Sequence, residues 1–262
     1  MVTRAPRLPS TQPAFVLHHY DWSETSLILD LFTREQGRLA VVAKGAKRPY
    51  SQLRSVLLPF QRLQVGLSKP SRDERSETEV QTLRTAEWAG GHTLPTGAAL
   101  FAGYYLNELL LKLLARQDPH PRIFDAYAVT LPLLSGDEER EDQRSQAALR
   151  AFELRLLADL GLLPDLSVVT QTQRPLDPER LYMLGAETGV SVPSHDATAF
   201  GAPQLVQLQA ALLHGSQAAL QQACADCLPA LKACLRSLLH YHLGQKPLRT
   251  RAVMLDLQKL LD

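Results

Sequence analysis

A stretch of basic residues in the first third of the chain carries the clearest chemistry. Between positions 38 and 72 the sequence has eight Lys or Arg residues and no Asp or Glu. The eight are Arg38, Lys44, Lys47, Arg48, Arg54, Arg62, Lys69 and Arg72. Clustered Lys and Arg neutralise phosphates without reading base sequence, and the ring of Tyr50 among them is able to stack a base. The stretch predicts sequence-tolerant single-strand binding, with a solvated basic loop and a packing role for Tyr50 as the open alternatives.

Three cysteines near the C-terminus raise the question of a metal site. Cys224, Cys227 and Cys234 precede His240 and His242, which together have the elements of a zinc site. The same segment reads as a helix, and free cysteine is a common buried residue. We therefore expect buried helical cysteines, no metal and no cofactor.

Catalytic motifs are missing from the sequence. It contains no Gly-x-Ser-x-Gly, no HExxH, no phosphate-binding glycine-rich loop and no two-metal carboxylate array. Glu77 and Glu79, the carboxylates nearest the basic stretch, alternate along an expected strand and are read as solvent-facing. We expect a binding protein and not an enzyme, and a metal-dependent nuclease is the alternative to test.

The basic stretch lies among short strands. Apolar runs or alternation predict strands over 14–18, 25–33, 38–43, 59–66 and 77–84. Residues 34–37 form a predicted hairpin turn, and 44–55 a long loop rich in Gly, Pro and Ser. Five short strands favour a five-stranded oligonucleotide-binding (OB) barrel, although periodicity does not separate it from other small β folds.

The rest of the chain has helical periodicity. Helices are predicted over 98–116, 122–134 and 143–160, then over 203–243, with a last one over 251–261. The stretch from about 164 to 203 is irregular, with a possible hairpin of 180–184 and 190–192. The fold class is thus α+β, with a flexible tail (1–13), a barrel domain (14–90) and a helical domain (91–262) that holds a small irregular insertion.

Composition fits a cytoplasmic protein. The chain has 262 residues, 45% of them hydrophobic and 21% charged, which is ordinary globular composition. No apolar run approaches the length of a membrane span, and the N-terminus lacks a signal-peptide core. Three cysteines favour a reducing compartment. The net charge of +1 hides the basic stretch, because the compensating acids lie elsewhere, notably in 137–142.

The order of several segments resembles the RecO family. They include 14–18 (AFVLH), 22–27 (WSETSL), 31–33 (LFT), 42–46 (VAKGA), 105–110 (YLNELL), 150–154 (RAFEL) and 243–248 (LGQKPL). The set spans nearly the whole chain in order, while the middle insertion diverges. Many family members carry four zinc-binding cysteines in that insertion, and 166–192 has none here, which argues against a structural zinc.

The resemblance implies a recombination mediator in DNA repair, located in the cytoplasm at the nucleoid. Its partners would be single- and double-stranded DNA, the acidic C-terminal tail of single-strand-binding protein, RecR and, indirectly, RecA. It would anneal complementary strands coated with single-strand-binding protein and, with RecR, help load RecA. The alternatives are a generic OB-fold binder of nucleic acid, RNA included, and a scaffold without annealing activity.

The resemblance also assigns residues. DNA contact falls to Arg38, Lys44, Lys47, Arg48 and Arg54. Lys246, Arg249 and Arg251 form a second basic cluster that either extends the DNA path or caps a helix C-terminus.

A receptor for the acidic tail needs a guanidinium beside an apolar pocket. Arg150 and Leu154 in the third helix take that role, against the alternative of an ordinary exposed helix arginine. Near the second strand, Trp22 is expected in the core and Ser23 or Thr25 in a turn. Gly45 either lets the backbone approach a phosphate or simply turns the chain.

Overall fold

The computed structural model describes residues 11–68, 80–90, 94–134, 139–193, 199–244, 248–250 and 252–253. The chain divides into two compact units. The barrel unit comprises residues up to 94 together with 109–124, and the helical unit comprises 95–108 and the residues from 125 onward. The predicted domain boundary at residue 90 does not anticipate that 109–124 pack with the barrel.

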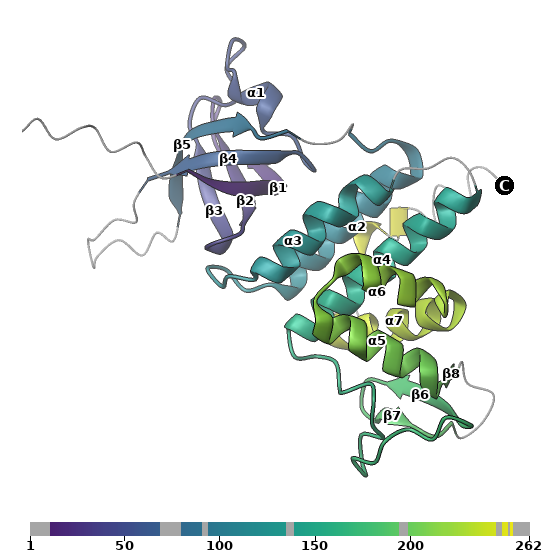
Figure 1. The fold of residues 1–262 in the computed structure, drawn as a ribbon. Coiled ribbons are helices and arrows are strands. Elements are labelled where there is room, and N and C mark those ends of the chain that lie inside the picture. Colours follow the sequence, from purple (N-terminus) through teal and green to yellow (C-terminus); the bar gives the residue numbers. More distant parts are fainter. Residues whose placement is uncertain are drawn as a thin grey trace, which may run out of the picture. The chain divides into compact units, whose positions relative to one another are not determined.

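Five strands close into a barrel in the order β1-β2-β3-β5-β4 (Figure 1). They are β1 (Thr11–Asp21), β2 (Leu27–Thr33), β3 (Gly37–Ala43), β4 (Arg62–Leu67) and β5 (Gln81–Trp88). All neighbours are antiparallel except β3 and β5, which pair in parallel, and the single-turn helix α1 (Leu53–Val56) lies between β3 and β4. This arrangement confirms the predicted OB fold.

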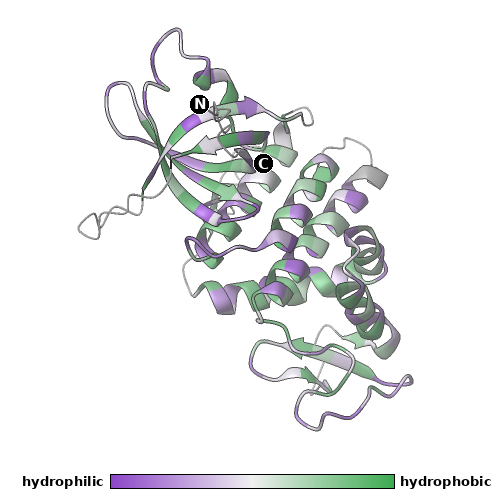
Figure 2. Cartoon of the chain, turned by 60° about the vertical axis from the view of Figure 1, so that its left-hand side comes forward, coloured by the Kyte–Doolittle hydropathy of each residue, from purple (hydrophilic) through white to green (hydrophobic). Residues whose placement is uncertain are grey.

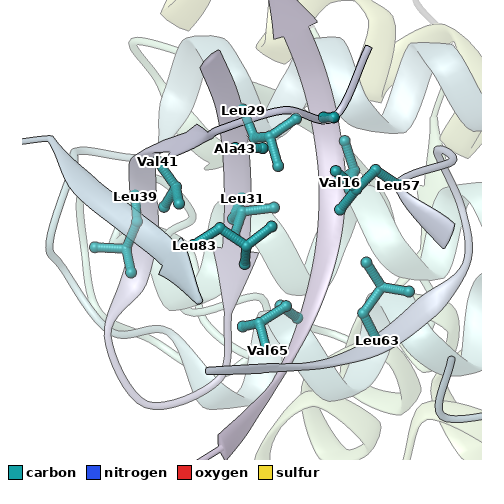
Figure 3. Packing of buried hydrophobic residues seen from close by; sticks show 12 residues of the cluster. Val16, Leu29, Leu31, Leu39, Val41, Ala43, Leu57, Leu63, Val65 and Leu83 are labelled. Atoms are coloured by element: carbon teal, nitrogen blue, oxygen red, sulfur yellow. The ribbon is translucent and has the colours of Figure 1, made fainter. Parts of the chain in front are cut away.

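The barrel interior is filled by aliphatic side chains from all five strands. The labelled residues in Figure 3, among them Val16, Leu31, Val41, Leu63 and Leu83, point into this interior. On the outer face, the Phe124 ring lies 5.2 Å from the ring of Phe15 and 5.4 Å from that of Phe32. Because residues 14–17 of β1 are buried on both faces, they form a continuous apolar run without alternation.

Three strands differ from the prediction by three residues or more at one or both ends. Strand β1 begins at Thr11, because pairing of Thr11–Phe15 with β4 extends it into the polar residues assigned to the tail. Strand β4 begins at Arg62, since Phe60 has a φ of 68°, which is incompatible with a strand. Strand β5 runs to Trp88 because its register with β4 joins Leu63 to Trp88.

The helical unit is built around α4 (Glu139–Asp159), which packs against three neighbouring elements. The other elements are α2 (Gly97–Leu113), α3 (Pro121–Thr130), the 3-10 turn η1 (Leu131–Leu134), α5 (Ala202–His214), α6 (Gln217–Ala225) and α7 (Leu228–Leu243). Every residue of α4 from Ala147 to Leu157 is buried. The predicted helix over 203–243 is three helices, because Gly215 adopts a φ of 82° and ends α5.

The predicted hairpin of the insertion is present. Strands β6 (Leu181–Gly185) and β7 (Gly189–Ser191) pair antiparallel, and β8 (Phe200–Gly201) adds a third strand that the sequence did not predict. Hydrophilic residues gather in the loops beside this sheet, whereas the helices carry both hydrophobic and hydrophilic residues (Figure 2). The predicted helix over 251–261 lies almost wholly outside the described residues.

The three cysteines are buried in the helical unit, as expected for packing residues. The Cys234 thiol donates a hydrogen bond to the Leu184 carbonyl at 3.3 Å, and the Cys227 thiol donates to Ala223 at 3.4 Å. Burial raises the pKa of Cys227 to about 11 and that of Cys234 to about 12.

Candidate nucleic-acid interface

Two loops meet at one end of the barrel. Asp21 pairs with Leu27, and Leu27 pairs with Ala43, so the turn 22–26 and the loop 44–52 start from the same edge of the sheet. The Lys47 amide donates to the Thr25 carbonyl at 2.9 Å and joins the two loops directly. We call these two segments, 22–26 and 44–52, together with Tyr20, the loop end of the barrel.

The loop 44–52 is a chain of reverse turns. The Arg48 amide donates to the Gly45 carbonyl at 3.1 Å, and the Ser51 amide donates to the Arg48 carbonyl at 3.0 Å. Gly45 has a φ of 71°, so a turn role accounts for it. Pro49 occupies the second position of the turn from Arg48 to Ser51, which its fixed φ favours. These turns hold the backbone while the side chains project outward.

Three of the predicted DNA contacts are exposed cations. Lys44, Arg48 and Arg54 make no ion pair with any residue that the structure describes. Lys47 is partly engaged, because its Nζ lies 3.2 Å from Asp21 Oδ1 and donates to the Ser23 carbonyl at 3.1 Å. The loop end, together with Arg54 in the adjoining helix α1, thus offers three available positive charges and a fourth that also ties the loops together.

Arg38 has a different environment. Its Nε donates to Asp30 Oδ1 at 2.9 Å, and its Nη1 donates to the carbonyls of Leu111 and, at 3.0 Å, Leu114. These carbonyls belong to the C-terminal end of α2, where backbone acceptors lack helical partners. Only 14% of the Arg38 side chain is exposed. Arg38 joins the barrel to the end of a helix, and we leave it out of the proposed DNA surface.

Exposed aromatic residues accompany the basic ones. Tyr50 is 100% exposed, Trp22 65% and Tyr20 50%. The expectation that Trp22 belongs to the core is wrong: the turn at Ser23–Ser26, where the Trp22 amide donates to the Ser26 carbonyl at 3.2 Å, lifts it out of the sheet. Sequence reasoning missed Tyr20 as a site residue, although the polar run that follows the apolar residues 14–17 was a signal.

Of the remaining basic residues named from the sequence, the structure describes only Arg62 and Arg249. Arg62 is exposed on β4, while Lys69, Arg72, Lys246 and Arg251 lie outside the described residues, as do Glu77 and Glu79. The Arg249 side chain is exposed, and its backbone amide donates to Glu108 Oε1 at 2.9 Å. Glu108 also accepts from the amide and hydroxyl of Thr250, so it anchors the short segment that carries Arg249.

The predicted tail receptor is a buried polar network. Arg150 Nη1 lies 2.7 Å from Glu153 Oε2, and Glu153 Oε1 accepts from the Tyr105 hydroxyl at 2.6 Å. Burial raises the pKa of Glu153, although the charge of Arg150 and the hydrogen bond from Tyr105 oppose that rise. Arg150 is therefore no ordinary exposed helix arginine. Leu154 is fully buried and offers no surface to a peptide, so we withdraw it as a contact.

Metal and membrane functions gain no support from the described residues. Among them, no group of three or more His, Cys, Asp or Glu side chains is placed to hold a metal ion. None of the described helices combines the length and apolar character that a membrane span requires.

Comparison with known proteins covers almost the whole chain. Residues 8–91 match the family model "Recombination protein O N terminal", and residues 94–252 match "Recombination protein O C terminal". The chain is 50% identical over 256 residues to "DNA repair protein RecO" of Polaromonas naphthalenivorans, which covers 96% of this chain and 98% of that protein. The protein of the same name from Variovorax paradoxus is 48% identical over 257 residues, 96% of this chain and 97% of that one. On the strength of both family models and these full-length relatives, the chain belongs to the RecO family of DNA repair proteins.

Proposed function

We propose that the chain acts as a recombination mediator that binds DNA through the loop end of its barrel and anneals complementary strands. The observation that carries this proposal is the succession of Lys44, Lys47 and Arg48 on a loop held by consecutive turns, followed by the exposed Arg54 in helix α1. Phosphate contacts of this kind ignore base sequence. An annealing protein needs that indifference, because it must accept any pair of complementary strands, and it performs no chemical step of its own.

We further propose that the helical unit binds the acidic C-terminal tail of single-strand-binding protein at Arg150. The guanidinium already holds Glu153, and its Nε has no hydrogen-bond partner among the described residues. A planar guanidinium has five donors, so Arg150 retains donors for a tail carboxylate. Membership of the family supports contact with RecR and help in loading RecA, and we propose both without assigning surfaces.

Annealing of coated strands tests this function. Two complementary fluorescent oligonucleotides are coated with single-strand-binding protein, either intact or lacking its tail, and their pairing is followed with and without the protein. We expect faster pairing that depends on the tail. No acceleration with either coat would contradict the mediator role and leave a generic OB-fold binder, which binding to RNA would then identify.

Charge and tail variants separate the two contacts in the same assay. Lys44→Glu/Arg48→Glu should abolish the acceleration, whereas Lys232→Glu/Arg236→Glu, an equal charge change at exposed positions of α7, should retain it. Arg150→Lys preserves the charge beside Glu153 but loses the planar fork. It should anneal naked strands at the wild-type rate and lose the tail-dependent part.

A further inference from the structure

We infer that the loop end stacks unpaired bases on the aromatic side chains of Tyr20, Trp22 and Tyr50, and so prefers single-stranded DNA to duplex. This inference rests on the proposed function and adds a second kind of contact to it. Phosphate contacts alone do not detect whether the bases of a strand are paired. Aromatic side chains do detect it, because they stack on unpaired bases, whereas the bases of a duplex are already stacked on one another.

Tyr20 owes its direction to a β-bulge. The register between β1 and β2 shifts between Val16 and His18, so that His18 pairs with Asp30 and Tyr20 pairs with Ile28. Directly opposed residues of antiparallel strands share a face, and Ile28 alternates with the core residues Leu29 and Leu31. Tyr20 is thereby placed on the outer face of the barrel, where its ring lies 4.5 Å from that of His18 in a T-shaped arrangement. Bulges re-aim side chains in this way.

Trp22 and Tyr50 stand on turns whose backbones are already fixed. The amide of Trp22 bonds to the Ser26 carbonyl, and Tyr50 occupies the third position of the turn closed by Arg48 and Ser51. The two turns are connected through Lys47, which bonds to residues 21, 23 and 25. An ordered backbone lowers the entropy lost when a ligand binds to the side chains.

The charges beside these rings favour a nucleic acid over an apolar peptide. Arg48 precedes Pro49 and Tyr50 on the same reverse turn, and Lys44 starts the loop that faces the turn carrying Trp22, because Ala43 pairs with Leu27. Of the two acidic residues in 20–26, Asp21 is paired with Lys47, which leaves Glu24. A loop end that carries both cations and exposed rings suits a ligand that offers both phosphates and bases.

Abasic DNA tests the inference, because it keeps the phosphates and removes the bases. Binding is measured by fluorescence anisotropy with three ligands: an oligothymidylate of about 20 nucleotides, an abasic strand of equal length, and a duplex. We expect Trp22→Ala/Tyr50→Ala to weaken binding of the oligothymidylate about 5- to 30-fold, which corresponds to one or two lost stacking contacts of about 1 kcal/mol each. Affinity for the abasic strand and the duplex should change less than about twofold. Tyr241→Ala, a change at a 53% exposed position of α7, is the matched control.

Tryptophan emission gives an independent readout. The chain has two tryptophans, so Trp88→Phe leaves Trp22 as the only one. Oligothymidylate should quench its emission, and the abasic strand should not. Equal weakening of all three ligands by Trp22→Ala/Tyr50→Ala, or unquenched emission at saturation, would overturn base stacking while leaving phosphate binding intact. Failure of the wild type to bind any of the three ligands would overturn both proposals.

Discussion

Arg38 and Arg48 illustrate how two arginines in one basic stretch acquire opposite roles. Arg48 lies on a reverse turn and is exposed. Arg38 faces Asp30 across the sheet and reaches backbone carbonyls more than seventy positions away in the sequence. The family resemblance assigned both to DNA, and the sequence did not separate them, because the partners of Arg38 come from a helix that the local pattern does not connect to the barrel.

We predict that Arg38→Ala destabilises the protein without acting through DNA. The change leaves two carbonyls at the end of α2 without the hydrogen-bond donor that Arg38 supplies. It also removes the nearer cation from Asp30, which is only 3% exposed. The remaining described ion pair of Asp30 is with Arg116 Nη2, at 3.7 Å. The free energy of unfolding should fall by about 2–4 kcal/mol, as for other broken buried pairs. Urea denaturation measures it. Arg48→Ala serves as the control and should stay within about 0.5 kcal/mol of wild type; similar values for both variants would contradict this assignment.

Arg150 departs from expectation in the same manner. Its neighbours in sequence suggested either a surface receptor or an exposed helix residue, whereas the side chain is 10% exposed and paired with a fully buried Glu153. The pairing of Arg150 with Glu153 could be predicted, because residues at i and i+3 are neighbours on a helix. The burial of Arg150 could not be predicted, because the residues that cover it come from α2 and from elements after the insertion. A tail peptide that binds Arg150 must therefore reach a partly enclosed guanidinium, which suits a short extended ligand.

At the scale of elements, local sequence patterns predicted which strands and helices exist better than they predicted where each one begins and ends. The runs at 25–33 and 38–43 correspond to β2 and β3, since a strand buried on both faces leaves a strong apolar signal. Strand β5 was placed about four residues early, because its only fully buried aliphatic residue is Leu83 and its register depends on β4. Likewise, the 109–124 segment was assigned by sequence to the helical domain, and only tertiary contacts with β1, β2 and β3 assign it to the barrel unit.

Two glycines in the barrel loops allow a matched prediction. Gly37 and Gly45 have φ values of 70° and 71°, so both resist a side chain on backbone grounds. A Cβ on Gly37 would also overlap the backbone of Asp118, whereas one on Gly45 would meet only the Arg48 side chain, at 3.5 Å. Gly45→Ala should cost about 1–2 kcal/mol of unfolding free energy. Gly37→Ala should cost at least about 1 kcal/mol more, because overpacking adds to the backbone strain.

Chemical denaturation of the two glycine variants checks this difference. A larger loss of unfolding free energy for Gly37→Ala would support the close approach of residues 117–118 to the β2–β3 turn. Equal losses would mean that backbone conformation alone decides the cost, and that the approach at Asp118 relaxes without penalty.

At the scale of the whole molecule, net charge misleads about the partner. The chain carries +1 overall, yet 38–72 contains eight basic residues and no acid. Interactions between exposed charges are screened beyond about 8–10 Å at physiological salt, so acids elsewhere in the chain do little to cancel the loop end. Distribution, and not the sum of charges, decides whether the surface attracts a phosphate backbone.

This locality leads to a prediction for salt dependence. Each phosphate contact to a single strand lowers the slope of log affinity against log salt by about 0.7. Lys44, Arg48 and Arg54, with Lys47 as a fourth, should give the wild type a slope of about −2 to −3 for oligothymidylate. Removing two contacts in Lys44→Gln/Arg48→Gln should reduce its magnitude by about 1.4. Anisotropy titrations over a range of salt concentrations measure both slopes, with Lys232→Gln/Arg236→Gln as a control of equal charge on exposed positions of α7.

The control is decisive because it changes the net charge by the same amount as the loop-end variant. If affinity followed net charge, the two variants would shift the slope equally. If it follows the phosphate contacts of the loop end, only Lys44→Gln/Arg48→Gln changes the slope. A loss of affinity in that variant with an unchanged slope would instead indicate that these side chains support the loop and do not touch phosphates, and would move the DNA surface elsewhere on the chain.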